Sequence, residues 1–386
     1  MMDAVKLALA GLVLLAGALA AVLSGILPLP DLAVVAERVA PILAFVVAVT
    51  VVAELATRAG VFDVAAAWLA RAARGRTALL WLLVVALAVV TTAFLSLDTT
   101  AVLLTPVVIA VARANGLPPL PFAFTTVWLA NTASLVLPVS NLTNLLAADR
   151  LPGGAATFLL LLGPSAAVAI VVTVALLWLI QRRHLVGTYV VAASPRVADR
   201  VQLTVAAAVV VVLMPFLVSG LEPWLPAAVA AAVLVGVFAW RSPRVLTVRL
   251  IPWSLLVFAA GLFTAVAALE ALGSASIASA VAGTGSGPLD LWRLSGTAML
   301  AANGVDNLPA YLLLEPAASS PERLAALLIG VNAGPLITPW ASLATLLWAE
   351  RLRAVGIAVP WRRFVAWGCV TAPVVVGAAT IPLFLR

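Results

Sequence analysis

The chain lacks the residues on which most metal and nucleophilic chemistry in proteins depends. Its 386 residues include one cysteine, Cys369, one histidine, His184, and one lysine, Lys6. A single cysteine excludes a disulfide framework, a paired-cysteine zinc site or a redox pair within one chain. A single histidine in a basic segment excludes His-based metal sites and Ser–His–Asp triads. The chain also lacks the GxxxxGK[ST] phosphate-binding loop, so any use of ATP needs another subunit.

Charged residues are also scarce. They make up 10% of the chain, and 65% of the residues are hydrophobic, whereas soluble domains carry roughly 25% charged residues. Many apolar runs reach about 20 residues, the length that an α-helix needs to cross a bilayer. The first run, Leu7–Leu27, is too long for the apolar part of a cleaved signal peptide. We therefore expect an all-α polytopic membrane protein with about ten transmembrane helices.

The net charge of +7 comes from arginines scattered over short loops between the apolar runs. A nucleic-acid-binding surface needs its basic residues on one face, which this spacing does not provide. Short loops rich in arginine lie on the cytoplasmic side of membrane proteins. We expect the following arginines to face the cytoplasm: Arg71, Arg74, Arg76, Arg182, Arg183, Arg196, Arg200, Arg241, Arg244, Arg249, Arg351, Arg353, Arg362 and Arg363.

Two stretches of the chain, residues 131–149 and 332–350, resemble one another at a separation of 201 positions. Duplicated polar segments broken by proline are typical of secondary transporters, whose binding site lies between two repeats. The polar segment Gly187–Arg200 is the linker in this interpretation. It divides one membrane domain into a first transmembrane repeat, residues 1–195, and a second, residues 196–386. The identical pairs are Asn131/Asn332, Leu135/Leu336, Pro138/Pro339, Leu142/Leu343, Leu145/Leu346, Leu146/Leu347 and Ala148/Ala349.

Prolines and glycines set the expected limits of two further segments. Pro41 and the prolines before it place the start of the second span near Ile42. The segment Gly273–Leu289 is rich in glycine and serine, which favours a loop or a hairpin.

Two carboxylates, Asp98 and Asp306, lie within apolar surroundings upstream of the two related stretches. A charged group at mid-membrane depth costs at least about 2.5–3.5 kcal/mol on insertion scales, so such a group is usually functional. Because desolvation disfavours the charged form of a carboxyl group, both are candidates for proton coupling. The alternative for each is a structural role, either paired with an arginine or as the N-cap of a helix. We interpret Glu54 as the structural partner of Arg58 at i+4 and Glu315 as an interfacial residue.

The breaks at Pro138 and Pro339 indicate a cavity, because non-helical backbone at membrane depth is tolerated only where protein or water satisfies it. Amide and hydroxyl side chains near the breaks can both donate and accept hydrogen bonds. They suit a small neutral hydroxylated solute, a small anion bound at half-helix N-termini, or a sodium ion, and the residue types alone do not separate these. The candidate binding residues are Thr99, Thr100, Asn131, Thr132, Ser134, Ser140, Asn141, Asn144, Asn303, Asn307, Asn332, Thr338, Ser342 and Thr345.

The segments SLDTTAVLLTPVVIA, NTASLVLPVSNLTNLLAAD and GPLITPWASLATLLW resemble the signatures of the bacterial arsenite/antimonite efflux permease family. This family lies within an ion-transporter superfamily that also holds sodium/carboxylate symporters. The resemblance runs from about Val39 to the C-terminus and departs from the family pattern at three positions. Asn131 and Asn332 stand where the family commonly has aspartate, and Asp306 stands where it commonly has asparagine.

The resemblance implies export of arsenite or antimonite in exchange for protons across a bacterial cytoplasmic (inner) membrane. It also implies two inverted repeats, each with a re-entrant hairpin and a broken helix, and no cofactor. A soluble ATPase subunit and a second copy of the chain are the protein partners that it allows. The nearest alternative is a proton- or sodium-coupled transporter of small anions or dicarboxylates with the same fold. A membrane-embedded enzyme needs a nucleophile–base pair or metal ligands, and a passive channel does not call for repeated broken helices.

Overall fold

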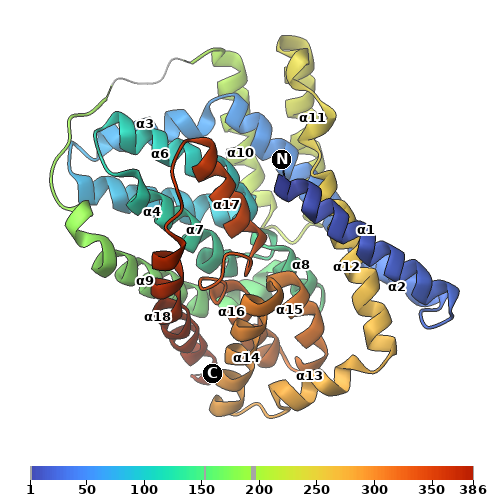
Figure 1. The fold of residues 1–386 in the computed structure, drawn as a ribbon. Coiled ribbons are helices and arrows are strands. Elements are labelled where there is room, and N and C mark those ends of the chain that lie inside the picture. Colours follow the sequence, from blue (N-terminus) through green and yellow to red (C-terminus); the bar gives the residue numbers. More distant parts are fainter. Residues whose placement is uncertain (1, 152–153, 193–196, 386) are drawn as a thin grey trace.

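The computed structural model describes residues 2–151, 154–192 and 197–385, and these form helices joined by turns (Figure 1). Within these ranges no β-strand occurs, and one isolated bridge joins Arg76 and Thr188. The predicted boundary between the repeats, at residues 195 and 196, lies outside the described residues. The all-α prediction is confirmed.

The first half of the chain contains one long helix after another, followed by a series of short ones. The elements are α1 (Met2–Leu23), α2 (Leu29–Arg58), α3 (Val61–Ala72), α4 (Thr77–Leu95), α5 (Leu97–Thr99), the π-helix η1 (Thr100–Leu104), α6 (Thr105–Ala114), α7 (Pro119–Thr132), the 3₁₀ helices η2 (Ala133–Leu135) and η3 (Pro138–Ser140), α8 (Leu142–Asp149) and α9 (Gly154–Leu185).

The second half shows a similar order of long and short helices. Its elements are α10 (Arg200–Phe216), α11 (Trp224–Arg241), the 3₁₀ helices η4 (Pro243–Val245) and η5 (Val248–Leu250), α12 (Trp253–Ala271), α13 (Ser274–Ala282), α14 (Pro288–Val305), α15 (Asn307–Leu314), η6 (Glu315–Ala317), α16 (Pro321–Ala333), α17 (Leu343–Ala354), α18 (Trp361–Thr380) and η7 (Ile381–Phe384).

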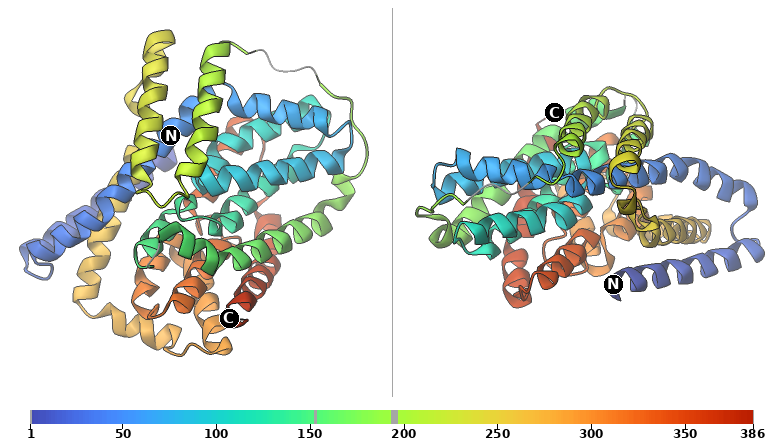
Figure 2. Two further views of the ribbon diagram at one scale, coloured as in Figure 1. Left: turned by 180° about the vertical axis from the view of Figure 1, so that it is seen from behind. Right: turned by 90° about the horizontal axis from the view of Figure 1, so that it is seen from above.

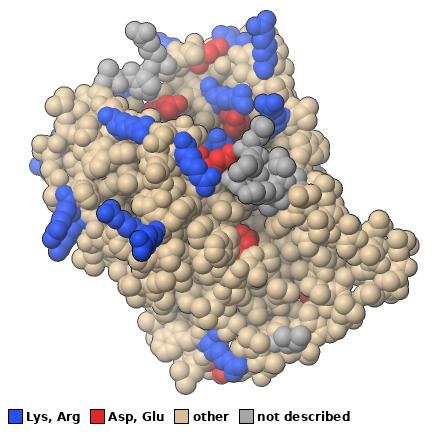
Figure 3. Space-filling view, viewed as in Figure 1, with Lys and Arg blue, Asp and Glu red and all other residues tan. Residues whose placement is uncertain are grey.

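Seven helical segments of the described chain are long and apolar enough to cross a membrane. Two further apolar helices, Leu9–Leu23 and Arg200–Phe216, are shorter. The face shown in Figure 3 is largely uncharged; most of its basic side chains lie in the upper half of the view, and one lies near the lower edge. The seven segments are Leu29–Arg58, Thr77–Leu95, Leu97–Ala114, Gly154–Leu185, Trp224–Arg241, Trp253–Ala271 and Trp361–Phe384.

Two expected helix limits were wrong. Pro41 lies inside α2, which begins at Leu29 rather than near Ile42. A proline within a membrane helix removes one backbone hydrogen bond, and neighbouring helices can compensate for that loss. The segment Gly273–Leu289 was expected to be a loop, but it contains helix α13. Gly273, with φ of 90°, makes the left-handed turn that separates α12 from α13.

Helices α1 and α12 form a close pair, and α11 packs against α2. In Figures 1 and 2, α1, α11 and α12 lie on one side of the molecule, away from α4, α9 and α18. Gly11 of α1 and Gly261 of α12 permit the close approach, since a Cβ on Gly11 would lie 2.6 Å from the backbone of Phe258. Small residues serve the same purpose at many membrane helix interfaces.

Candidate functional site

Two turns with the same unusual backbone conformation precede short helices in the two halves. Ser96, between α4 and α5, has φ 86° and ψ 160°, and Asp306, between α14 and α15, has φ 95° and ψ 155°. A side chain with positive φ costs backbone energy, so such residues mark constrained sites. Both cap the helix that follows: Ser96 Oγ accepts from the N–H of Thr99 at 3.4 Å, and Asp306 Oδ1 accepts from the N–H of Leu308 at 3.2 Å.

Asp306 therefore occupies the same structural position as Ser96, whereas Asp98 lies within the first turn of α5. The alternative role considered for both acids, the N-cap, is correct for Asp306 and wrong for Asp98. The Asp306 carboxylate therefore lies at the N-terminal end of α15, where the helix dipole favours negative charge.

A second pair of short helices, α8 and α17, begins after the two proline breaks. Asn141 precedes α8 with φ −152° and ψ 148°, and Ser342 precedes α17 with φ −151° and ψ 139°. The Asn141 amide oxygen accepts from the N–H of Thr143 at 3.4 Å. The Ser342 side chain makes no capping bond. The backbone conformation before α8 is therefore repeated before α17, but the capping hydrogen bond of the side chain is not.

Asn332, at the end of α16, is bonded to the start of α8. Its Oδ1 accepts from Asn141 Nδ2 at 2.7 Å and from Thr143 Oγ1 at 2.9 Å, and its Nδ2 donates to Asn144 Oδ1 at 2.6 Å. Asn332, Thr143 and Asn144 have no exposed surface. Asn144 Nδ2 in turn donates to the carbonyl oxygens of residues 134 and 137, which closes the break after α7. This cluster joins the two related stretches of sequence.

Asn303, near the end of α14, supports the other break. Its Nδ2 donates to the carbonyl oxygens of Met299 and Gly334 at 2.8 and 2.9 Å. Its Oδ1 accepts from the N–H groups of Ile337 and Thr338 at 3.1 and 3.0 Å, and its own carbonyl accepts from Thr338 Oγ1 at 2.8 Å. These bonds satisfy backbone groups that the break leaves without helical partners. Asn303 and Thr338 are therefore fully occupied in holding the break.

The other candidate residues divide into satisfied and unsatisfied groups. The hydroxyls of Thr100, Thr132, Ser134 and Ser140 bond to carbonyl oxygens, and Thr100 also pairs with Thr92 Oγ1 at 2.9 Å. Asn307 is buried at the start of α15. Buried oxygen atoms without a hydrogen-bond partner occur at Asp98 Oδ1, Asn131 Oδ1, Ser342 Oγ and Thr345 Oγ1.

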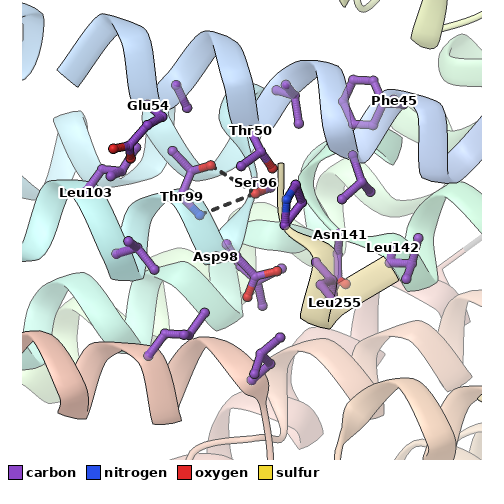
Figure 4. A pocket seen from close by; sticks show the side chains of 18 of the residues that line it. Phe45, Thr50, Glu54, Ser96, Asp98, Thr99, Leu103, Asn141, Leu142 and Leu255 are labelled. Atoms are coloured by element: carbon purple, nitrogen blue, oxygen red, sulfur yellow. Dashed lines mark hydrogen bonds between the residues drawn. The ribbon is translucent and has the colours of Figure 1, made fainter. Parts of the chain in front are cut away.

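A cavity of about 450 Å³ lies beside Asp98. Of the predicted residues, Asp98, Thr99 and Asn141 line its wall. Figure 4 shows Glu54 and Thr50 of α2 on one side and Asp98 on the other, with the hydrogen-bonded pair Ser96 and Thr99 between them. Most of the remaining wall is apolar, from α2, α8, α12 and α17.

Thr50 and Ser96 are polar residues of this region that the sequence interpretation missed. Ser96 precedes Asp98 by two positions, and its preference for helix N-caps was the only available signal. Thr50 lies in an apolar helix far from either break. Glu54 pairs with Arg58 at 2.9 Å, as predicted, and also lines the cavity.

A second cavity, of about 270 Å³, lies nearer the N-terminal end of α2. It is lined by Arg38, Asp149 and Trp224 among others. Phe45 of α2 and Leu145 of α8 line both cavities and so stand at the boundary between them. Along α2, residues 38–45 line the second cavity and residues 45–54 line the first, so the two cavities follow one another along this helix.

Glu315 was expected at an interface but is buried beside this second cavity. Its carboxylate accepts from Arg38 Nη2 at 2.6 Å and from Tyr311 Oη at 3.2 Å, and Arg150 Nη1 lies 3.5 Å away. A buried carboxylate needs such partners to offset its lost hydration. Three separate parts of the chain, α2, the end of α8 and the end of α15, are joined at this point.

Comparisons with known proteins agree with a transporter. The sequence matches the citrate transporter family over residues 4–345. It is 31% identical to an arsenical pump membrane protein of Escherichia coli, over 93% of this chain and 89% of that protein. It is 32% identical to the protein of the same description from Yersinia enterocolitica, over 92% of this chain and 88% of that protein.

The crystal structure of the YdaH transporter of Alcanivorax borkumensis has a similar fold, with a TM-score of 0.56, 16% identity and coverage of 93% of this chain and 89% of that one. The fold, the buried polar breaks and the cavity define a polytopic membrane transporter. The chain belongs to the family of ion transporters that includes the arsenical pump membrane proteins. The predicted resemblance is thereby confirmed.

Proposed function

We propose that the protein is a secondary active transporter that exports arsenite or antimonite across a bacterial cytoplasmic membrane in exchange for protons. The observation that carries this proposal is the position of Asp98. Its carboxylate lies at the wall of a mainly apolar cavity, and one carboxylate oxygen is buried without a partner. The identity to arsenical pump membrane proteins supports the choice of cargo.

The cavity wall suits a small neutral trihydroxide. The hydroxyls of Thr50, Ser96 and Thr99 and the amide of Asn141 offer both donors and acceptors. Trivalent arsenic prefers thiolate ligands, but Cys369 is exposed on α18 and does not line the cavity. Binding by hydrogen bonds alone is weak, and a transporter needs a cargo that it can release.

Proton movement down its electrochemical gradient can supply the free energy for export of the cargo against a concentration gradient. Each tenfold gradient of a neutral cargo costs about 1.4 kcal/mol, and one charge crossing 100 mV releases about 2.3 kcal/mol. We assign proton exchange to Asp98 and Asp306.

We propose that two repeats, residues 1–195 and 196–386, provide the alternating access. Gly60 with φ 85° before α3 corresponds to Gly273 with φ 90° before α13, and the later turns and breaks follow in the same order. The boundary formed by Phe45 and Leu145 separates the two cavities, and a shift of α8 relative to α2 would connect the binding region to one side or the other. A second copy of the chain or a soluble ATPase subunit belongs to this proposal as a partner.

Export into everted membrane vesicles tests the proposal. With an imposed proton gradient, vesicles that contain the wild-type protein should accumulate arsenite, and those with Asp98→Asn should not, at equal amounts of inserted protein. Asp63→Asn on α3 is the matched control, because Asp63 lines neither cavity. Accumulation by Asp98→Asn at the wild-type rate would refute the assignment of Asp98.

The second candidate is a transporter of a small carboxylate. The match to the citrate transporter family favours it, and so do the short-helix N-termini near the cavity, which attract anions. The same vesicles should therefore be tested with citrate and a dicarboxylate beside arsenite. Proton-driven accumulation of a carboxylate without that of arsenite would select this candidate.

A further inference from the structure

Two carboxylates, Asp98 and Glu54, line the larger cavity, and none of the described residues that line it is basic. Figure 4 shows the two acids on different sides of the cavity, with Ser96 and Thr99 between them. The volume of about 450 Å³ lies in the range of pockets that hold drug-sized ligands. Size alone therefore does not keep out organic anions that are larger than arsenite, and selection between a neutral solute and an anion depends on charge.

The backbone at the cavity wall favours anions. Leu142 begins α8 and Leu343 begins α17, and both residues line the cavity. The N-terminal end of a helix carries partial positive charge and free N–H groups, which together attract anions. A cavity with such a wall admits a small carboxylate unless a negative side chain opposes it. The two acids at the wall supply that opposition, because a cleft lined by charges of one sign repels ions of the same sign.

An ion pair holds Glu54 in place at the wall. Arg58 follows it by one turn of α2, and Arg58 Nη2 and Nε lie 2.9 and 3.0 Å from Glu54 Oε1. Both contacts are to the same carboxylate oxygen. Arg58 is not among the residues that line the cavity, whereas Glu54 is. A ligand in the cavity therefore lies closer to the carboxylate than to the guanidinium, and the nearer charge acts on it more strongly.

Asp98 cannot reject anions throughout a transport cycle. In the proposed function it takes up and releases a proton, so its negative charge is absent during part of the cycle. Glu54 is the other acid at the wall, and proton exchange is not assigned to it. Its negative charge can thus oppose anions while Asp98 is neutral. The two acids then have different tasks in one cavity, Asp98 in coupling and Glu54 in the choice of cargo.

We propose that Glu54 is a specificity-determining residue that keeps anions out of the cavity and so restricts the cargo to neutral solutes. The inference rests on the proposed function, since it takes this cavity to be the place where cargo binds. Repulsion of a competing ligand is a general route to specificity. Here the repelled class is that of small carboxylates, which the helix ends at the same wall would otherwise attract.

Three variants separate this role from a purely structural role of the ion pair. Glu54→Gln removes the acid and leaves the charge of Arg58. Arg58→Gln removes the base and leaves the acid. The exchange Glu54→Arg/Arg58→Glu keeps an i,i+4 pair but places the positive charge at the wall. A structural role predicts that the first two variants behave alike and that the exchange behaves as the wild type does.

Binding of an anion can be measured without transport. The purified full-length protein in lipid nanodiscs is heated at constant ionic strength while choline succinate replaces choline chloride. We expect Glu54→Gln and the exchange variant to show a saturable rise of a few degrees in the unfolding midpoint, because a ligand that binds the folded state stabilises it. The succinate concentration for half of this rise should be at least about tenfold lower than in the wild type and in Arg58→Gln.

The matched control is Glu37→Gln, which removes an acid from α2 that lines neither cavity and should respond to succinate as the wild type does. Two outcomes would overturn the role of Glu54: the same succinate dependence in Glu54→Gln and the wild type, or equal gains in Glu54→Gln and Arg58→Gln. If Glu54→Gln yields no folded protein, the exchange variant decides, and a response equal to that of the wild type overturns the role.

The vesicle assay separates this failure from that of the transport proposal. Proton-driven arsenite export by the wild type, together with no gain of succinate binding in Glu54→Gln, refutes only the role of Glu54. A gain of succinate binding in Glu54→Gln, together with no arsenite export by the wild type, refutes only the assigned cargo.

Discussion

Replacement of Asn332 by alanine should destabilise the protein more than most single substitutions. Asn332 makes three side-chain hydrogen bonds to the start of α8. Each contributes about 1 kcal/mol net, and the partners left unsatisfied add to that loss. Because Thr143 and Asn144 are fully buried and Asn141 is 5% exposed, water cannot replace the lost bonds. We expect a total loss of about 3–5 kcal/mol.

Thermal unfolding of the purified protein in nanodiscs measures this loss. At about 2 °C per kcal/mol for a large chain, the midpoint should fall by roughly 6–10 °C. Asn332→Asp keeps the two hydrogen bonds that the side chain accepts and loses the one that it donates. Its unfolding midpoint should therefore lie between those of the wild type and Asn332→Ala. Thr204→Ala, which removes an exposed hydroxyl bonded to its own helix, serves as the control. A decrease of less than about 2 °C in the unfolding midpoint of Asn332→Ala would refute the reasoning.

Three further predictions concern stability. Glu315→Gln should cost about 1–3 kcal/mol in the same unfolding assay, less than a fully buried pair, because the side chain of its partner Arg38 is 32% exposed. Gly330→Leu should prevent α16 from packing on α14, since even a Cβ at Gly330 would overlap α14, and should lower the yield of folded protein in size-exclusion chromatography. The hydrogen bond from Arg241 lowers the pKa of Asp199 below its ordinary value of 3.8. The stabilisation it gives is complete above pH 3.8 and is lost as the pH falls through the lowered folded-state pKa, so unfolding midpoints of wild type and Asp199→Asn should converge only in acid.

The membrane class and the positions of the short helices could be predicted from the sequence, because they depend on local patterns. Apolar runs of spanning length identify membrane helices without knowledge of their neighbours. The break predicted at Pro138 lies between α7, which ends at Thr132, and α8, which begins at Leu142. Proline and polar residues in an apolar segment point to a break wherever the segment lies in the fold.

The side-chain partners could not be predicted, because they depend on long-range contacts. Glu315 is separated from Arg38 by 277 positions, and nothing near it in sequence indicates the pair. The start of α2 was predicted too late, near Ile42, because proline interrupts helices in water far more often than in a membrane. The positive φ of Ser96 could not be predicted either, since serine rarely adopts that backbone conformation.

The comparison of Ser96 with Asp306 bears on why Asp306 is an acid. In both turns the side chain caps the following helix, and Ser96 does so with a hydroxyl. Capping therefore does not require a carboxylate at Asp306, and serine and aspartate are about equally good N-caps. The acid brings a charge into a membrane-embedded region, which is costly unless the charge has a use. A charge that the fold does not need supports a role for Asp306 in coupling, and Asp98, which caps nothing, supports the same role more directly.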